Sequence, residues 1–299
     1  MTVDLRFPAM GTKAHVLVRD GEPEHAAYAL ARTRELEQRW SRFIPESELS
    51  RVNRAAPEPV AVSDDTLRLA ECALHGKRMT GGRFDATLLG PLVAAGYDRD
   101  FALLSAAPEE EDLAPRRRPS RGHGEVVVDR EAGTVCVRDG ARLDSGGLGK
   151  GLAADLVAEE LVARGASGAL VNLGGDLRAA GDPPRANGWS VDLDNPVDRD
   201  GPPLARLALA EGGLATSSPY ARRWFQGRTQ RHHLIDPATG RPAVSDVVSV
   251  TVLEAEGWTA EVLAKAAFLA GAAGALALLE GKGLRGVVLG RDGRVLRTA

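Results

Sequence analysis

The segment best suited to chemistry is a glycine-rich loop, DSGGLGKG at 144–151, which leads into a stretch of helical composition. Closely spaced glycines let backbone amides approach an anion, and the start of a helix favours negative charge. Lys150 adds a cation, so the loop suits a phosphate. It is neither a GxGxxG motif nor a Walker A loop, because Gly151 stands where a Ser or Thr would bind magnesium. A tight turn into a helix, with Lys150 simply exposed, is the alternative interpretation.

A second region gathers hydroxyls, guanidinium groups and imidazoles, in the segments ATSSPYARRW (215–224) and HHLIDPATG (232–240). Neighbouring side chains on an extended segment point to opposite faces, so His232 and His233 are poorly placed to bind one metal together. We expect His233, which lies next to the Leu-Ile-Asp turn, to be the functional histidine. A hydrogen-bonded core histidine is the competing interpretation.

Composition narrows the classes of function. The 299 residues are 43% apolar and 26% charged, which is typical of a globular protein with a large core. A net charge of -3 provides no broad basic field, so nucleic acid is not an expected partner. Cys72 and Cys136 lack zinc-site spacing and are expected to be buried free thiols. No signal-peptide pattern or membrane-spanning apolar run is present, which predicts a cytoplasmic protein.

Hydrophobic periodicity predicts the elements that hold these loops. A strand is expected at 13–19 and strands at 168–173, 189–194, 204–210 and 249–253, with hairpins at 125–140 and 286–298. Helices are expected at 24–40, 63–80, 152–164 and 260–279, the last interrupted at Gly271. The charged, Pro- and Arg-rich stretch 98–124 predicts a flexible surface loop. No repeat or composition break divides the chain, so we expect one α+β domain over 1–299.

Taken in order, these segments resemble the ApbE family of FAD:protein FMN transferases along nearly the whole chain. The order of the segments makes the resemblance specific, because any single one could match by chance. The matching segments are MGT (10–12), SRFIPESELSRVN (41–53), GGRFDATLLGPL (81–92), LDSGGLGKGLAAD (143–155), LVNLGGDLRAAG (170–181), ATSSPYARR (215–223), HHLIDPATGRP (232–242) and AEVLAKAAFLAG (260–271).

The resemblance implies an ApbE-like α+β fold, in which mixed β-sheets and packed helices form one body or two lobes around a central FAD cleft. It implies an enzyme that splits the FAD pyrophosphate and moves FMN onto a Thr or Ser hydroxyl of an acceptor flavoprotein, releasing AMP. Such a transfer needs positive charge near phosphorus and an oriented hydroxyl. In the family, Mg²⁺ supplies part of that charge.

The resemblance also assigns roles by position. His233 would orient or deprotonate the incoming hydroxyl, and Lys150 would lie near the phosphates. On residue type alone, Phe43 and Phe84 could instead be core residues, and Asp85 could cap a turn. The residues expected to contact FAD are Met10, Phe43, Arg83, Phe84, Asp85, Asp144, Lys150 and Ile235.

The expected metal site departs from the family pattern. In the family the late helix reads AD-x-x-x-T, and its Asp and Thr ligate magnesium together with a backbone carbonyl at the position of Gly147. Here Glu261 and Lys265 take those two places, and a charged lysine cannot ligate magnesium. Either Glu261 keeps the metal with Gly147 while Lys265 moves aside, or Lys265 pairs with Glu261 and its charge replaces the metal. A surface salt bridge without a role is the third interpretation.

Three functions follow from these observations. The leading one is the transferase. A metal-dependent FAD pyrophosphatase, with water as acceptor and FMN and AMP as products, is the second. A flavin-binding protein without catalysis is the third, and the residues at 261 and 265 motivate it.

Overall fold

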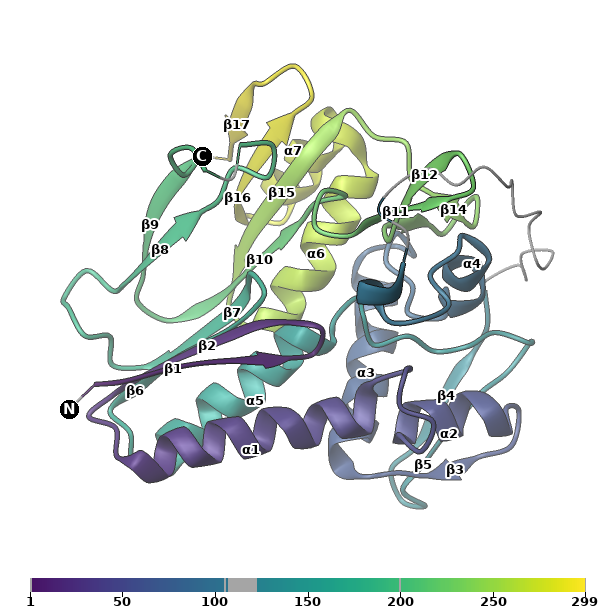
Figure 1. Cartoon of the computed structure of the whole chain (residues 1–299), viewed down its shortest axis with the longest axis horizontal. Helices are drawn as coiled ribbons and strands as arrows, with labels where there is room; N and C mark the ends of the chain where they lie inside the picture. Colours follow the sequence, from purple (N-terminus) through teal and green to yellow (C-terminus); the bar gives the residue numbers. More distant parts are fainter. Residues whose placement is uncertain (1, 105, 107–122, 199, 299) are drawn as a thin grey trace.

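The computed structural model describes residues 2–104, 106, 123–198 and 200–298. Its largest element is an eight-stranded sheet in which every neighbouring pair of strands is antiparallel (Figure 1). In spatial order, the strands are β1 (Val3–Ala9), β2 (Thr12–Arg19), β6 (Gly168–Leu173), β7 (Asp176–Gly181), β10 (Gly212–Ser217), β15 (Val247–Glu254), β16 (Arg285–Gly290) and β17 (Val295–Arg297).

Both faces of this sheet are covered. Successive side chains of a strand point to opposite faces, and β6 follows this rule: Val171 packs in the core shared with the helices, whereas Leu170 packs against a two-stranded ribbon. Val288 and Val287 of β16 divide in the same way. The ribbon is formed by β8 (Trp189–Leu193) and β9 (Ala205–Leu209), and the helices are α1 (Pro23–Trp40), α5 (Gly149–Ala163), α6 (Gly257–Leu269) and α7 (Gly271–Gly281).

A second group of smaller elements lies beyond the ends of α1, α5 and α6 (Figure 1). Its elements leave a hollow against the main sheet, which is described below. The group comprises α2 (Glu48–Ala55), α3 (Asp64–Met79), α4 (Leu89–Ala94), the short 3₁₀ helix Phe101–Leu103, a sheet ordered β3 (Val60–Ala61), β5 (Thr134–Val137) and β4 (Val126–Asp129), and the hairpins β11 (Arg223–Gln226) with β12 (Thr229–His232) and β13 (Ile235–Asp236) with β14 (Arg241–Pro242).

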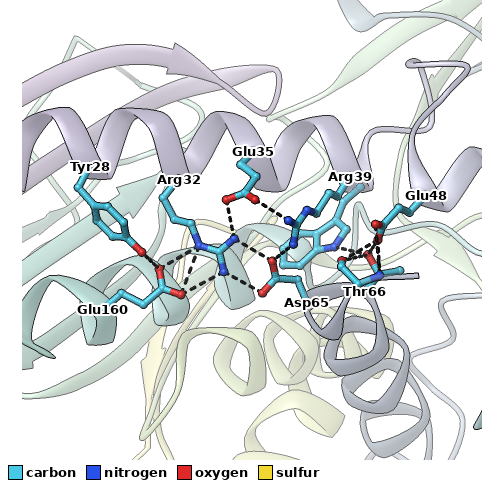
Figure 2. Close-up of polar contacts among 10 residues, drawn as sticks. Tyr28, Arg32, Glu35, Arg39, Glu48, Asp65, Thr66 and Glu160 are labelled. Atoms are coloured by element: carbon cyan, nitrogen blue, oxygen red, sulfur yellow. Dashed lines mark hydrogen bonds and ion pairs between the residues drawn. The ribbon is translucent and has the colours of Figure 1, made fainter. Parts of the chain in front are cut away.

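Arg32 of α1 links α1 to α3 and α5 (Figure 2). Its guanidinium donates two hydrogen bonds of 2.8 Å to the carboxylate of Asp65. It also donates to both carboxylate oxygens of Glu160, at 3.0 Å each. Paired N–H donors that meet a carboxylate form the strong, directional type of ion pair. One side chain of α1 therefore contacts both other helices, and Arg39 and Tyr28 of the same helix add hydrogen bonds to Asp65 and Glu160.

The structure confirms the α+β class and most expected elements, including the break at Gly271 between α6 and α7. Both cysteines are buried and free, as expected. Helix α5 begins at Gly149, three residues earlier than the expected Leu152. Three strands of the main sheet, β1, β7 and β10, were not expected from the sequence, nor were the helices α2 and α4 and the short strands β3 and β11 to β14.

Two further expectations concern a loop and the membrane. Most of the surface loop expected at 98–124 lies outside the described residues. Its described beginning is not simply solvated, because Phe101 packs edge-on against Tyr97 with ring centroids 6.2 Å apart. Among the helices of the described chain, none combines the length and apolar character needed to cross a bilayer.

Candidate active site

A cavity of about 400 Å³ opens between the main sheet with its helices and the group of smaller elements. Residues from Met10 to Leu269 line it, so its wall is assembled from nearly the whole chain. The glycine-rich loop reaches it through Ser145, Gly146, Gly147 and Gly149, and the His-Leu-Ile segment reaches it through His233. The two regions that the sequence singled out for chemistry therefore share one cavity.

The turn between β1 and β2 forms one rim of the cavity. Met10 and Gly11 both have positive φ angles, 51° and 64°, as a two-residue hairpin turn requires. Arg222 donates a hydrogen bond of 3.3 Å to the Gly11 carbonyl and another to the Tyr97 hydroxyl. The guanidinium thereby fixes the turn to the opposite wall.

Aromatic rings form the next part of the wall. The guanidinium of Arg42 lies 4.2 Å from the ring centroid of Phe43 and 4.4 Å from that of Tyr97. Its Nη1 donates to the Tyr97 carbonyl at 2.8 Å, and its Nε lies 3.4 Å from Asp144 Oδ1. The side chain is only 9% exposed, so the ring contacts and the ion pair hold it in a fixed position.

Four charged side chains meet at the inner end of the cavity, and we call Lys150, Asp176, Glu261 and Lys265 the charge tetrad. Lys150 Nζ donates to Asp176 and, at 2.9 Å, to Glu261 Oε1. Lys265 Nζ donates to the same Glu261 oxygen at 3.0 Å, and the Gly151 N–H donates to Oε2 at 2.9 Å. Glu261 is thus bonded through both carboxylate oxygens, and its side chain is 1% exposed.

The close packing of α5 on α6 brings the tetrad together. A Cβ on Gly151 would lie 2.4 Å from the carbonyl oxygen of Gly257, so only glycine allows this approach. Asp155 of α5 then accepts hydrogen bonds from the Gly257 and Trp258 amides, at 2.7 and 2.9 Å. These amides begin α6 and have no partner within the helix. The start of α6 is therefore anchored to α5, with Glu261 one turn further on.

Mutual attraction keeps Lys150 and Glu261 charged. Burial alone would lower the pKa of Lys150, but the carboxylates of Asp176 and Glu261 outweigh burial and raise it. Burial would raise the pKa of Glu261, yet Lys150 and Lys265 lower it to about 2. Burial, together with the charge of Glu261, raises the pKa of Asp176. Lys150 and Glu261 are therefore an ammonium and a carboxylate at neutral pH.

The two adjacent histidines have different surroundings. His232 uses both ring nitrogens on backbone groups: Nε2 lies 3.0 Å from the Ala243 carbonyl and Nδ1 lies 3.3 Å from the Leu234 amide. His233 lines the cavity, and its Nδ1 lies 3.4 Å from the Arg222 carbonyl. Because a carbonyl only accepts, Nδ1 must carry the proton, which leaves Nε2 of a neutral ring as an acceptor. Burial, assisted by the charge of Lys265, lowers the pKa of His233 well below 6.5.

Some expected ligand contacts are already used within the protein. Asp85 Oδ1 accepts hydrogen bonds from the amide and hydroxyl of Thr87, and Oδ2 pairs with Lys77 at 2.8 Å, so Asp85 does cap its turn. Phe84 is 4% exposed and packs in the core, with one edge on the cavity. The amide of Gly151 is bonded to Glu261, so it is not available to an anion as the sequence suggested.

The family model described as the ApbE family matches residues 10–288. The chain belongs to the ApbE family. It is 30% identical over 286 residues to the FAD:protein FMN transferase of Vibrio cholerae, covering 93% of this chain and 84% of that protein. It is also 30% identical over 272 residues to the enzyme of the same name from Treponema pallidum, covering 85% and 74%.

Solved ApbE structures agree with the fold. The ApbE protein of Thermotoga maritima superposes with a TM-score of 0.84 at 25% identity, covering 100% of this chain and 97% of that chain. The flavin transferase ApbE of Vibrio cholerae superposes with a TM-score of 0.81, also at 25% identity and with the same coverage. The expected family and fold are thus confirmed.

Within this ApbE-family chain, the sequence-predicted residues converge on one place. All of them line the cavity except Glu261, which lies directly behind its wall and holds Lys150 and Lys265. Their individual roles stay predictions. The lining residues among them are Met10, Phe43, Arg83, Phe84, Asp85, Asp144, Gly147, Lys150, His233, Ile235 and Lys265.

Sequence reasoning missed four residues of the ApbE-family site. Asp176 stands in the matched segment LVNLGGDLRAAG, and Arg222 in ATSSPYARR, so each carried a signal that residue type alone could have raised. Arg42 also lies in a matched segment, but only its burial between two rings distinguishes it from a surface arginine. Tyr97 lies outside the matched segments, five residues beyond the end of GGRFDATLLGPL, and carried no signal.

Proposed function

We propose that the cavity binds FAD and that the chain transfers FMN from it to a Thr or Ser hydroxyl of an acceptor flavoprotein. The observation that carries the proposal is the meeting of the glycine-rich loop, the charge tetrad and His233 in one cavity. Family membership and curated relatives named FAD:protein FMN transferase support it. Met10, Phe43 and Ile235 offer apolar surface for the flat rings of FAD, and Arg83 and Asp144 offer polar contacts.

In the proposed reaction, the acceptor oxygen forms a bond to the phosphorus of the FMN half. The phosphoanhydride bond breaks, and AMP leaves with the bridging oxygen. His233 Nε2 takes the hydroxyl proton, since Nδ1 is already protonated and the ring is neutral. Lys150 and Lys265 offset the negative charge on the phosphates. The products are FMN-protein and AMP.

Magnesium, the other expected participant, does not fit the residues present. The expected ligands are the Gly147 carbonyl, Glu261 and position 265. Both Glu261 oxygens already accept hydrogen bonds, and Lys265 is a cation. In the described ranges there is no group of three or more His, Cys, Asp or Glu side chains that could hold a metal. We therefore derive no step through a metal ion.

Incubation with FAD and a flavoprotein peptide that carries an acceptor Thr tests the proposal. The expected result is a peptide whose mass increases by FMN less one water, together with free AMP. A peptide with Ala in place of the acceptor Thr is the control. If the peptide gains no mass either with a chelator or with Mg²⁺, the transferase proposal is wrong.

The same assay separates the two alternatives. Release of FMN and AMP without acceptor would identify a pyrophosphatase. Retention of FAD without turnover would identify a binding protein, an alternative that Lys265 at the metal position keeps open.

Two expectations complete the proposal. We propose that residues 1–299 form a single transferase domain, which is supported by a main sheet that contains both β1 and β17. A cytoplasmic location remains a prediction from the sequence.

A further inference from the structure

Lys265 lies close to the other two expected metal ligands, Glu261 and Gly147. Its Nζ is 3.0 Å from Glu261 Oε1, and its Cε is 3.6 Å from the point that a Cβ on Gly147 would occupy. The lysine chain therefore runs between the two residues whose oxygen atoms would hold the metal. An ammonium therefore lies within hydrogen-bond distance of the carboxylate that was expected to hold the metal.

The two lysines of the tetrad differ in how much of their hydrogen-bonding capacity the protein uses. Each ammonium has three N–H donors. Lys150 donates to two carboxylates, those of Asp176 and Glu261, whereas the hydrogen bond described for Lys265 is to Glu261 alone. Both lysines line the cavity, where the side chain of Lys150 is 21% exposed and that of Lys265 is 15% exposed. Lys265 is therefore the ammonium with more N–H donors left for a ligand.

The charge balance of the tetrad also favours Lys265 as a contact for a diphosphate. Two ammonium groups offset the two carboxylates, so the tetrad is neutral when all four groups are ionised. Without Lys265, two carboxylates would face a single ammonium. That excess negative charge, at low exposure, would repel a diphosphate.

We propose that Lys265, supported by Lys150, binds the diphosphate of the flavin nucleotide in place of a divalent cation. FAD binding is then independent of magnesium. Glu261 holds both ammonium groups at the inner end of the cavity instead of ligating a metal. The inference rests on the proposed function, because it assumes that the cavity takes FAD.

The test measures the dissociation constant of FAD in excess chelator and again in millimolar Mg²⁺. The proteins are the wild type, Lys265→Met, and Lys282→Met as a matched control on an exposed lysine outside the cavity. Riboflavin, which has no phosphate, serves as a second ligand. Met keeps the length and apolar stem of lysine and removes the charge.

We expect the wild-type affinity for FAD to change less than about twofold between chelator and Mg²⁺. K265M should bind FAD about tenfold more weakly in chelator, the loss of roughly one charge-assisted hydrogen bond, and K282M should bind as the wild type. Riboflavin affinity should be the same in all three proteins.

Three results would overturn the inference: wild-type affinity that rises about tenfold or more with Mg²⁺, K265M that binds FAD as tightly as wild type, or equal losses for FAD and riboflavin. The comparison of wild-type FAD affinity in chelator and in Mg²⁺ needs no variant, so it tests the inference even if K265M does not fold. A cavity that binds no FAD under either condition would instead refute the proposed function.

Discussion

His233 is the residue to which the proposed reaction assigns the proton transfer. Its hydrogen bond to the Arg222 carbonyl fixes the proton on Nδ1, and its burial keeps the ring neutral. A neutral imidazole with one free acceptor nitrogen is what a base needs. The neighbouring His232 cannot take this role, because both of its nitrogens are engaged with the backbone.

Replacing His233 by Gln should separate chemistry from binding. The rate of FMN transfer is expected to fall by about 10² to 10⁴, because the amide cannot accept the hydroxyl proton. FAD affinity should stay within a few fold. Single-turnover transfer and FAD titration measure the two effects, with His15→Gln, a β2 residue outside the cavity, as control. Unchanged transfer in H233Q would remove His233 from the reaction.

The pH dependence of transfer follows from the lowered pKa of His233. The neutral ring is the active form, so kcat should stay constant as the pH falls through 6.5, the ordinary histidine value. The rate should decline only well below it. Because the pKa of His233 is lowered in the folded protein, the unfolded chain protonates this imidazole more readily than the folded chain does. The contribution of neutral His233 to stability is therefore present above pH 6.5 and is lost as the pH falls. A kcat inflection near 6.5 that is absent from H233Q would contradict the assignment.

At the scale of elements, the α5–α6 pair positions the charge tetrad. Asp155→Asn tests this link, because the amide keeps one acceptor for the Gly257 and Trp258 N–H groups and loses the other. We expect the free energy of unfolding to fall by about 1–2 kcal/mol and FAD affinity to weaken in parallel.

Denaturant unfolding and FAD titration measure both effects. Glu159→Gln, on the same helix but 42% exposed, is the control and should change stability by less than about 0.5 kcal/mol. If D155N weakens stability but leaves FAD affinity unchanged, the anchor does not position the site.

The sequence predicted secondary-structure elements better than it predicted contacts between side chains. Alternation and helical spacing are local, so the long helices and the main-sheet strands β2, β6, β15, β16 and β17 could be predicted, whereas β1, β7 and β10 were missed. The i,i+4 spacing likewise indicated the Glu261 and Lys265 pair. The contribution of Lys150 to that pair could not be predicted, because it reaches Glu261 across 111 positions of sequence. The pairing of Asp176 with Lys150 could not be predicted for the same reason, because it is set by the packing of α5 against β7.

At the scale of the whole molecule, the contacts of Arg32 link helix α1 to helices α3 and α5 (Figure 2). Arg32→Met should lower the free energy of unfolding by about 2–3 kcal/mol, because Asp65 and Glu160 lose their shared partner. Arg34→Met, on the exposed side of the same helix, should have little effect. Denaturant unfolding compares the two. Equal losses in both variants would mean that the contacts of Arg32 add nothing specific.

The acid stability of the protein should also reflect these contacts. Burial acts to raise the pKa of Asp65, but Arg32 and Arg39 outweigh it and lower the pKa below the ordinary 3.8. The stabilisation from the Asp65 ion pairs is therefore complete above the pKa that Asp65 has in the unfolded chain. It is lost as the pH falls through the lower pKa of Asp65 in the folded protein. Acid titration should show wild-type stability decreasing in this range more steeply than that of R32M. Parallel acid curves for the two proteins would contradict this reading.

The strand order of the main sheet has a consequence for biosynthesis. β2 pairs with β6, and the cavity is complete only when residues near Leu269 have joined those near Met10. Long sequence separations between pairing strands slow folding, because the entropy cost of closing the chain precedes the stabilising contacts. A ribosome-bound chain would therefore expose unpaired sheet edges until late in its synthesis. FAD could bind and stabilise the fold only after the residues that form the cavity have come together.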